Sequence, residues 1–325
     1  MALDTLRARG RRAIGDLSLL NVSLAACAVA CSGSCDSGRA RVPTVSAVDV
    51  HRFVDAYHRL VRSDSACAPF AAYLAGASEG LRAYVGKYEM TQRDLCRAVR
   101  RSPRGYLALE AKLPALDSAI TDIRTLFTKL ETLIPGGRPP DVYFVVGDGI
   151  SGGTVTNGRS PIVLIGMERN GAVAGLPGTI AHEFVHTQQN YPLIGIMTGG
   201  PSFLRGTLLR HAIKEGGADF IASLVVGKPR HNAFGEAHAA ELWRDFQRDK
   251  HTKDYRLWLY NGWNAKELKS LGERPGDLGY WMGYLITKAY YDKAPDKAAA
   301  IHDLLTITDF DTFLARSGYA GPAPR

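Results

Sequence analysis

The feature that most constrains this fold is a group of three ionisable side chains inside an otherwise apolar helical segment. Residues 179–188 read TIAHEFVHTQ, with His182, Glu183 and His186 among isoleucine, alanine, phenylalanine and valine. Residues four apart lie on one face of a helix, so both imidazoles can point at one ion. Burial of such polar groups without partners costs several kcal/mol. The chain must therefore fold so that a metal ion or other polar groups meet this helix.

The order of these residues, H-E-x-x-H, is typical of hydrolytic zinc sites. Glu183 lies about 100° around the helix from His182. From there it can reach a metal-bound water as general base without ligating the metal. The alternative interpretation is a pair of satisfied core histidines beside a surface glutamate. It is disfavoured because all three side chains would need other partners in an apolar environment.

A second apolar segment supplies candidates for the third ligand, since a hydrolytic zinc site usually has three protein ligands. Residues 208–224 read LLRHAIKEGGADFIASL. We expect Glu215 to be the third ligand. Asp219, one turn later on the same face, should accept a hydrogen bond from a ligand histidine. The two glycines between them each cost about 1 kcal/mol in a helix, which indicates that another helix packs closely there. His211 is the rival ligand.

The five residues His182, Glu183, His186, Glu215 and Asp219 resemble the pattern of the gluzincin metallopeptidases. Twenty-eight residues separate the second histidine from the glutamate, more than in the thermolysin-like and M1 aminopeptidase-like families. The chain is most similar to uncharacterised bacterial families of predicted zinc-dependent proteases. The resemblance covers roughly residues 140–316. It implies one Zn²⁺ per chain and hydrolysis of peptide bonds in a peptide or protein substrate.

The same resemblance implies a side chain that stabilises the oxyanion. M1-like peptidases use a tyrosine in a Y-x-x-G segment, and residues 279–286 read GYWMGYLI. Tyr280 is the expected residue, with Tyr284 as the alternative. His231 and His238 are further alternatives, because thermolysin-like enzymes use a histidine for this task.

The expected fold class is α+β and mostly helical. Residues 45–134 have helical periodicity, whereas 142–146 and 162–166 are short and β-branched and predict strands. Helices follow from Pro177. We therefore expect a gluzincin-like domain at 135–325, preceded by a helical region. The resemblance also implies that the strand before the metal helix, IVLIG at 162–166, is the edge strand that pairs with an extended substrate.

The N-terminus resembles a bacterial lipoprotein signal. Four arginines within residues 7–12 precede an apolar run at 17–26, which ends in the lipobox-like sequence Leu-Ala-Ala followed by Cys27. A competing cleavage site of the A-x-A type follows at 28–30. We expect removal of residues 1–26 and lipidation of Cys27.

This expectation gives the protein a location outside the cytoplasm. Residues 27–44 would be a flexible tether, and the lipid would anchor the protein to a membrane, facing the periplasm or the cell exterior. The formal net charge of +8 would fall to +6, since four arginines and two aspartates are removed. The basic residues are dispersed and no nucleic-acid motif is present, so a nucleic-acid partner is not expected. The oligomeric state is left open.

Two cysteines, Cys67 and Cys96, remain in the body of the chain. They can form a disulfide in an oxidising compartment, and two unrelated buried thiols are the alternative.

Two functions of different classes fit these residues. The first is a zinc peptidase of the cell envelope. The second is a catalytically inactive, zinc-binding envelope lipoprotein that acts as a scaffold or interaction module. Glu183 favours the peptidase, because a structural site needs no general base, whereas four protein ligands would favour the scaffold.

Overall fold

The computed structural model describes residues 42–61, 67–156, 160–192, 206–228, 231–261, 269 and 271–322. They belong to one unit, Val42–Arg325. The predicted signal, its cleavage sites and Cys27 lie outside the described residues. Among the described residues, no helix is both long and apolar enough to cross a membrane.

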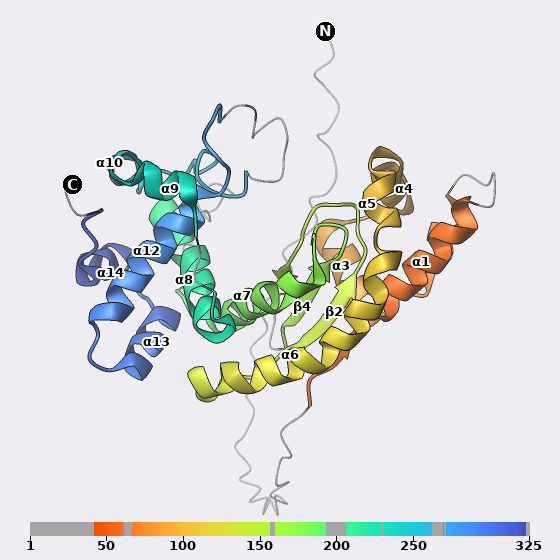
Figure 1. The fold of residues 1–325 in the computed structure, drawn as a ribbon, viewed down its shortest axis with the longest axis horizontal. Coiled ribbons are helices and arrows are strands. Elements are labelled where there is room, and N and C mark those ends of the chain that lie inside the picture. The colour runs from red at the N-terminus through yellow and green to blue at the C-terminus, as the bar shows by residue number, and fades with distance from the viewer. Residues whose placement is uncertain are drawn as a thin grey trace, which may run out of the picture. The chain divides into compact units, whose positions relative to one another are not determined.

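The expected α+β class is confirmed, with many helices around a small mixed sheet (Figure 1). The sheet has the order β1 (Val45–Ser46), β2 (Asp141–Val145), β4 (Ile162–Gly166) and β3 (Thr154–Val155). The first three strands are parallel, and β3 is antiparallel to β4. All residues of β2 and β4 are buried, which explains their continuous apolar sequences.

The sheet order corrects one expectation. The strand at 162–166 is not an edge strand, because β4 lies between β2 and β3. The edge beside it is β3, two residues long, from the glycine-rich segment that precedes β4 in the chain. The edge position was implied by the resemblance and not by the residues of 162–166, and it is taken by β3, which pairs with β4 across eight to ten residues.

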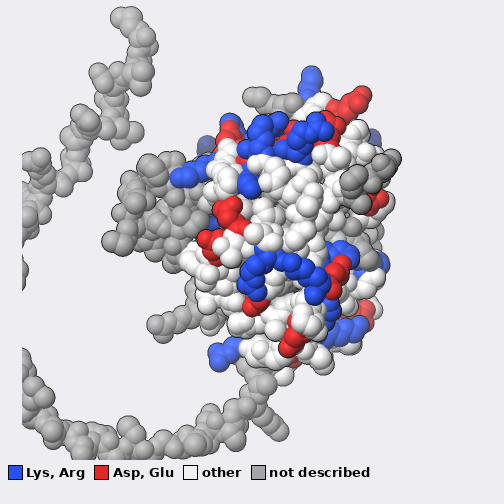
Figure 2. All heavy atoms as spheres, turned by 90° about the vertical axis from the view of Figure 1, so that its left-hand side faces the viewer, with Lys and Arg blue, Asp and Glu red and all other residues white. Residues whose placement is uncertain are grey.

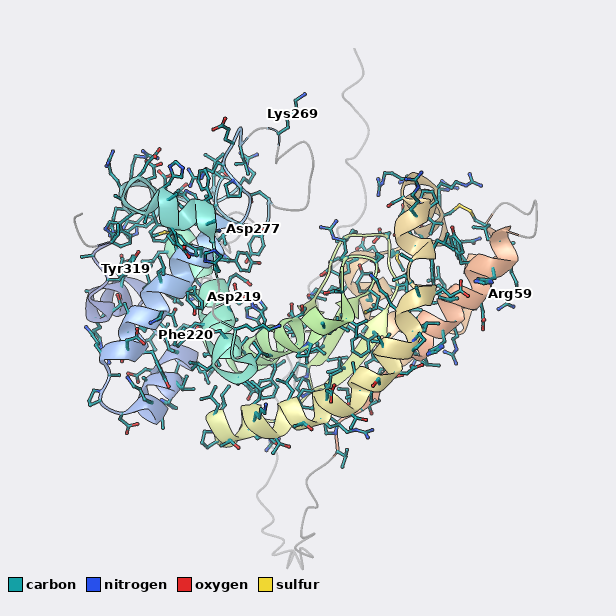
Figure 3. All side chains as sticks on the ribbon, in the orientation of Figure 1. Arg59, Asp219, Phe220, Lys269, Asp277 and Tyr319 are labelled. Carbon is teal, nitrogen blue, oxygen red and sulfur yellow. A yellow bond between two sulfur atoms is a disulfide. The ribbon has the colours of Figure 1, made fainter. Side chains whose placement is uncertain are left out.

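Helices of the N-terminal region pack against this sheet. They are α1 (Val48–Val61), α2 (Ala68–Ala75), α3 (Glu79–Tyr88), α4 (Gln92–Arg101), α5 (Pro103–Leu107), the 3₁₀ helix η1 (Glu110–Lys112) and α6 (Leu113–Leu133). Helices α1 and α3 contact β2, and α6 contacts β1. A disulfide joins Cys67, just before α2, to Cys96 in α4, with 5.9 Å between the Cα atoms (Figure 3). Of the two possibilities for these cysteines, a disulfide or two separate thiols, the structure contains the disulfide.

The C-terminal part of the described chain is helical, and its helices α7 and α8 carry the candidate metal ligands. They are the 3₁₀ helix η2 (Val173–Gly175), α7 (Leu176–Gln188), α8 (Leu208–Val226), α9 (Ala233–Ala237), α10 (Ala239–Asp249), α12 (Leu278–Lys293), α13 (Lys297–Leu305) and α14 (Phe310–Ser317). Helix α7 lies between the sheet and α8, and α12 packs along α8 (Figure 1). On the face shown in Figure 2, basic and acidic side chains are interspersed.

Close packing of α8 on α12 accounts for one glycine of the predicted pair. A Cβ atom on Gly216 would lie 2.2 Å from the backbone nitrogen of Tyr284. On the facing helix, a Cβ atom on Gly283 would lie 1.7 Å from the carbonyl oxygen of Ala212. Gly217 has ordinary space, with Thr287 Oγ1 3.5 Å from its added Cβ. The two helices therefore touch through their backbones beside Glu215.

Candidate metal centre

Helices α7 and α8 bring three predicted ligands together. His182 and His186 lie one turn apart on α7, with their Nε2 atoms 3.0 Å apart. Glu215 Oε2, from α8, lies 3.0 Å from His186 Nε2 and 3.4 Å from His182 Nε2. The three side chains are 13 %, 7 % and 6 % exposed, in the order His182, His186, Glu215. A tetrahedral zinc with bonds of about 2.0–2.1 Å has ligand atoms about 3.3 Å apart, so these residues fit the ion.

Hydrogen bonds on the far side of each imidazole orient it. His182 Nδ1 donates to Asp219 Oδ1 at 2.8 Å, as expected from the sequence. His186 Nδ1 lies 2.8 Å from Gln189 Oε1. The amide of Gln189 is oriented because its Nε2 donates to the carbonyl oxygen of Lys214 at 2.8 Å. Its oxygen therefore accepts from His186 Nδ1.

Because both Nδ1 atoms donate, each imidazole turns its Nε2 toward the other and toward Glu215. This converging set can hold a metal ion, and without one a proton on an Nε2 nitrogen satisfies it. The surrounding charge has the matching sign. Burial lowers the pKa of His182, yet Asp219 and Glu215 outweigh it and raise that pKa to about 10. Burial also opposes ionisation of Glu215, but His186, His182 and Lys214 hold its pKa well below the usual range.

Glu183 lies outside this group of ligands. It is buried against the loop that enters β3, and a Cβ atom on Gly153 would lie 2.6 Å from Glu183 Oε1. Burial raises the pKa of the Glu183 carboxyl, and the two histidines partly offset this effect. A buried carboxyl with a raised pKa beside a cation site is suited to accept and release a proton.

The N-terminal region also reaches this edge of the site. Lys87 on α3 donates from Nζ to Thr154 Oγ1 and to the carbonyl oxygen of Val155, both at 2.6 Å. These bonds fasten β3, and with it the loop containing Gly153, to a helix of residues 45–134. That region therefore shapes the surroundings of Glu183.

The two candidate tyrosines on α12 differ in position. The Tyr280 ring lies 6.2 Å from the ring of His182, with an angle of 24° between their planes. Tyr284 is buried against Phe220, and its hydroxyl lies 3.5 Å from Ser223 Oγ. Tyr280 is therefore the candidate beside the ligands.

The candidate histidines pair elsewhere. His231 Nδ1 lies 2.7 Å from Glu236, and His238 Nδ1 lies 3.5 Å from Glu241, all four on the surface. His211, the rival ligand, packs its ring 4.6 Å from that of Tyr255 and is not one of the converging groups.

The sequence did not indicate Tyr260 or Gln189. Tyr260 donates from Oη to Glu215 Oε1 at 2.9 Å, and Lys214 Nζ lies 3.3 Å from the same oxygen. Each of the three ligands thus has a hydrogen-bond partner behind it. Gln189 could have been found as a polar neighbour three residues after His186, at the end of the helix. Tyr260 had no such local signal.

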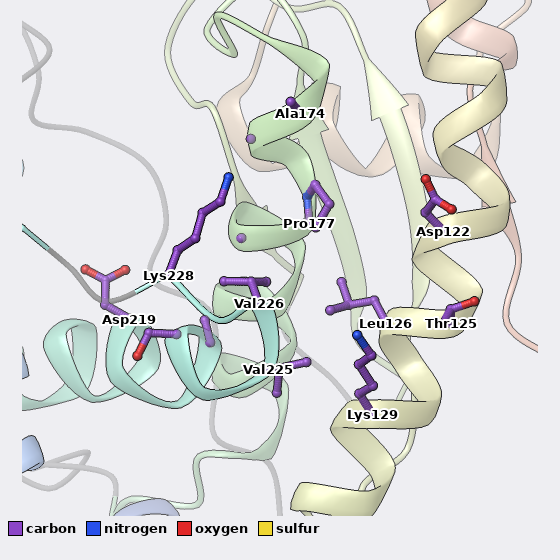
Figure 4. Close-up of a pocket in the computed structure, with 14 residues that line it drawn as sticks. Asp122, Thr125, Leu126, Lys129, Ala174, Pro177, Asp219, Val225, Val226 and Lys228 are labelled. Atoms are coloured by element: carbon purple, nitrogen blue, oxygen red, sulfur yellow. The ribbon is translucent and has the colours of Figure 1, made fainter.

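A groove of about 590 Å³ lies between α6, the start of α7 and the C-terminal half of α8 (Figure 4). Asp219 is part of its wall. Gly178, one turn before the first ligand histidine, and Ser223, one turn after Asp219, continue the helix faces that carry the ligands. Lys129 and Lys228 also line the groove. The groove therefore lies behind His182, on the Asp219 side, and none of the three converging side chains lines it.

Comparison with known proteins gives no relative of this chain, since no family model, no curated protein and no solved structure matches it.

Proposed function

We propose that this protein is a zinc-dependent peptidase of the gluzincin type. The observation that carries the proposal is the convergence of His182, His186 and Glu215 at 3.0–3.4 Å, each with a partner behind it, beside the buried carboxyl of Glu183. A purely structural zinc site has no use for that carboxyl.

His182, His186 and Glu215 would hold the ion. When bound, zinc polarises a substrate carbonyl and lowers the pKa of water at the site. Glu183 takes a proton from the attacking water as the oxygen of that water bonds to the scissile carbonyl carbon, and it delivers this proton to the leaving nitrogen as the C–N bond breaks. Tyr280 is the proposed hydrogen-bond donor to the carbonyl oxygen as negative charge develops there. Its place next to His182 supports that role.

The substrate is proposed to be an extended peptide. Strand β3 ends the sheet, and a peptide that adds to this edge has to share or displace the bonds that Lys87 and Ser151 make to the carbonyl oxygens of Val155 and Gly153. The groove along α7 and α8 offers space for the residues on one side of the scissile bond. Strand β3 is joined to the site through Gly153, which lies against Glu183, and the groove through Asp219, the partner of His182.

We further propose that the protein acts outside the cytoplasm, anchored by a lipid on Cys27 after removal of residues 1–26. The disulfide between Cys67 and Cys96 supports this location, because such bonds persist in oxidising compartments.

The decisive test combines metal content with cleavage of a peptide library by the purified protein. We expect one zinc per chain and cleavage that stops when a chelator removes the metal. Full zinc occupancy without cleavage of any peptide would instead support the inactive envelope scaffold. Absence of zinc binding would end both proposals.

A further inference from the structure

The chain around Tyr260 adopts an unusual backbone. Among the described residues, four that are not glycine have positive φ, and two of them are Tyr260 at 59° and Asp277 at 60°. A left-handed conformation costs a residue with a Cβ atom about 1–2 kcal/mol. Such residues persist only where surrounding interactions hold them.

Those interactions form a reciprocal clamp between the turn and the start of α12. The backbone nitrogen of Asn261 donates to Asp277 Oδ1 at 3.1 Å, and that of Asp277 donates to Asn261 Oδ1 at 2.7 Å. Asn261 is only 1 % exposed, and its Nδ2 donates to the carbonyl oxygen of Arg256 at 2.6 Å. Gly279 donates to the carbonyl oxygen of Trp258 at 2.7 Å. The clamp fixes both residues with positive φ.

The fixed turn presents the Tyr260 hydroxyl to Glu215. Oε1 of this carboxylate accepts the bond from Tyr260 at 2.9 Å, whereas Oε2 faces the two imidazoles. Holding one oxygen restricts rotation of the carboxylate and keeps the other oxygen directed at the ion position. Lys214 also approaches Oε1, at 3.3 Å, but through a flexible four-carbon stem, whereas the equally accessible Tyr260, 40 % exposed, is a rigid ring on a fixed turn.

We propose that Tyr260 is a positioning residue for Glu215 and that the Asn261–Asp277 clamp sets the zinc affinity through it. The inference rests on the proposed zinc site. The hydrogen bond from Tyr260 would orient Glu215 as the bonds to Asp219 and Gln189 orient His182 and His186. Loss of one such partner typically lowers metal affinity 10–100-fold.

The test measures zinc affinity of Tyr260→Phe by competition with a chromophoric chelator. We expect affinity about 10–100-fold below wild type. The matched control is Tyr255→Phe, in the same aromatic cluster, with rings 5.9 Å apart and no hydrogen bond to Glu215 among those of the described residues. Its affinity should equal that of wild type. Unchanged affinity in a folded Tyr260→Phe protein would overturn the proposal.

Peptidase rates at saturating zinc distinguish positioning from direct action on substrate. A positioning residue predicts that kcat and KM of Tyr260→Phe return to wild-type values once the metal site is filled. A rate that stays low at full zinc occupancy would mean that the hydroxyl acts on the substrate, and the positioning role would be wrong.

The clamp is tested with two substitutions of one residue. Asp277→Ala removes the acceptor for Asn261 and should weaken zinc binding, whereas Asp277→Asn keeps an acceptor oxygen and should restore it. Equal affinities of Asp277→Ala and wild type would refute the clamp. Failure of the wild-type protein to bind zinc would count against the proposed function itself. The variants test only the positioning role, because their zinc affinity is compared with that of wild type.

Discussion

The carboxyl groups of two glutamates, the buried Glu215 and the partly buried Glu168, respond in opposite ways to their surroundings. Glu215 faces two imidazoles and Lys214, and its pKa is held well below the usual range despite burial. Glu168, after β4, accepts backbone N–H groups from Gly147 and Gly149, both at 3.1 Å. There burial outweighs the two hydrogen bonds and raises the pKa from 4.5 to about 7.

The comparison shows that the groups a carboxyl faces decide which ion its site can hold. Cationic groups keep Glu215 charged, and its Oε2 converges with two imidazole nitrogens, so the α7–α8 site favours positive charge, from a proton or from a metal ion. Neutral backbone donors leave Glu168 able to take up a proton near neutral pH. The loop that donates hydrogen bonds to Glu168 continues to Gly153, which borders Glu183. The first site is therefore suited to chemistry, and the second to holding a loop in place.

The largest expected effect separates the base from the ligands. Glu183→Gln should keep zinc, because Glu183 is not a ligand, but should lower the peptidase rate about 10²–10⁴-fold, since the amide cannot accept a proton. His186→Ala should lose zinc and activity together. Zinc stoichiometry and rate, measured on both variants and wild type, test this difference. A fully active, zinc-loaded Glu183→Gln protein would rule out the hydrolytic mechanism.

The next effect concerns the partner of His182. Asp219→Ala removes the acceptor for His182 Nδ1 and should weaken zinc binding about 10–100-fold. Asp122→Ala is the matched control, because Asp122 lines the same groove without bonding to a ligand. Chelator competition on both variants tests the assignment. Similar losses in the two would mean that general groove charge, rather than orientation of the imidazole, supports the metal.

The sequence predicted that the side chains of the candidate ligands would converge, because helical periodicity places them on two helix faces. His182 and His186 share a face of one helix, Glu215 and Asp219 share a face of another, and burial of all four requires that the faces meet. The glycine at 216 signalled the close approach of α12. Periodicity also found β2 and β4 within one residue of their observed ends.

The missed features depend on contacts between distant parts of the chain. Tyr260 donates a hydrogen bond to Glu215, 45 residues earlier in the chain. Its turn has positive φ at a residue that is not glycine, so the sequence carries no local signal for it. Strand β1 joins the sheet by pairing with β2, almost a hundred residues later. The pairing of Cys67 with Cys96 is likewise a long-range outcome. The expectation of an edge strand at 162–166 failed for a different reason: it came from the family resemblance, and β3, only eight to ten residues away, pairs with β4 in a local hairpin.

The glycine pair on α8 gives a smaller effect, on stability. Gly216→Ala forces a Cβ atom against the backbone of α12 and should lower the free energy of unfolding by about 1–3 kcal/mol. Gly217→Ala has space for the methyl group and should raise stability by up to about 1 kcal/mol, through helix propensity. Urea unfolding of the two variants measures both changes. Equal effects would mean that α8 and α12 are not in backbone contact beside Glu215.

The smallest expected effect is on the pH dependence of stability, and it concerns Glu168. Glu168 has a folded-state pKa near 7, above its ordinary value of 4.5, so between these pH values the folded protein keeps a proton that the unfolded chain has lost. The stability from this group is therefore complete below about pH 4.5 and is lost as pH rises through 7. Solvent reaches part of the side chain, so we expect a loss of about 1–2 kcal/mol rather than the full value of the shift.

Glu168→Gln isolates this contribution, because the amide is neutral at every pH and retains one acceptor oxygen. Urea unfolding of metal-free wild type and variant, at pH 4.5 and 7.5 with the disulfide intact, gives the difference in stability at each pH. Wild type should lose about 1–2 kcal/mol relative to the variant between them. The same pH dependence in both proteins would show that Glu168 stays ionised when folded. Backbone N–H groups alone would then suffice to keep a buried carboxylate charged, and the contrast with Glu215 would disappear.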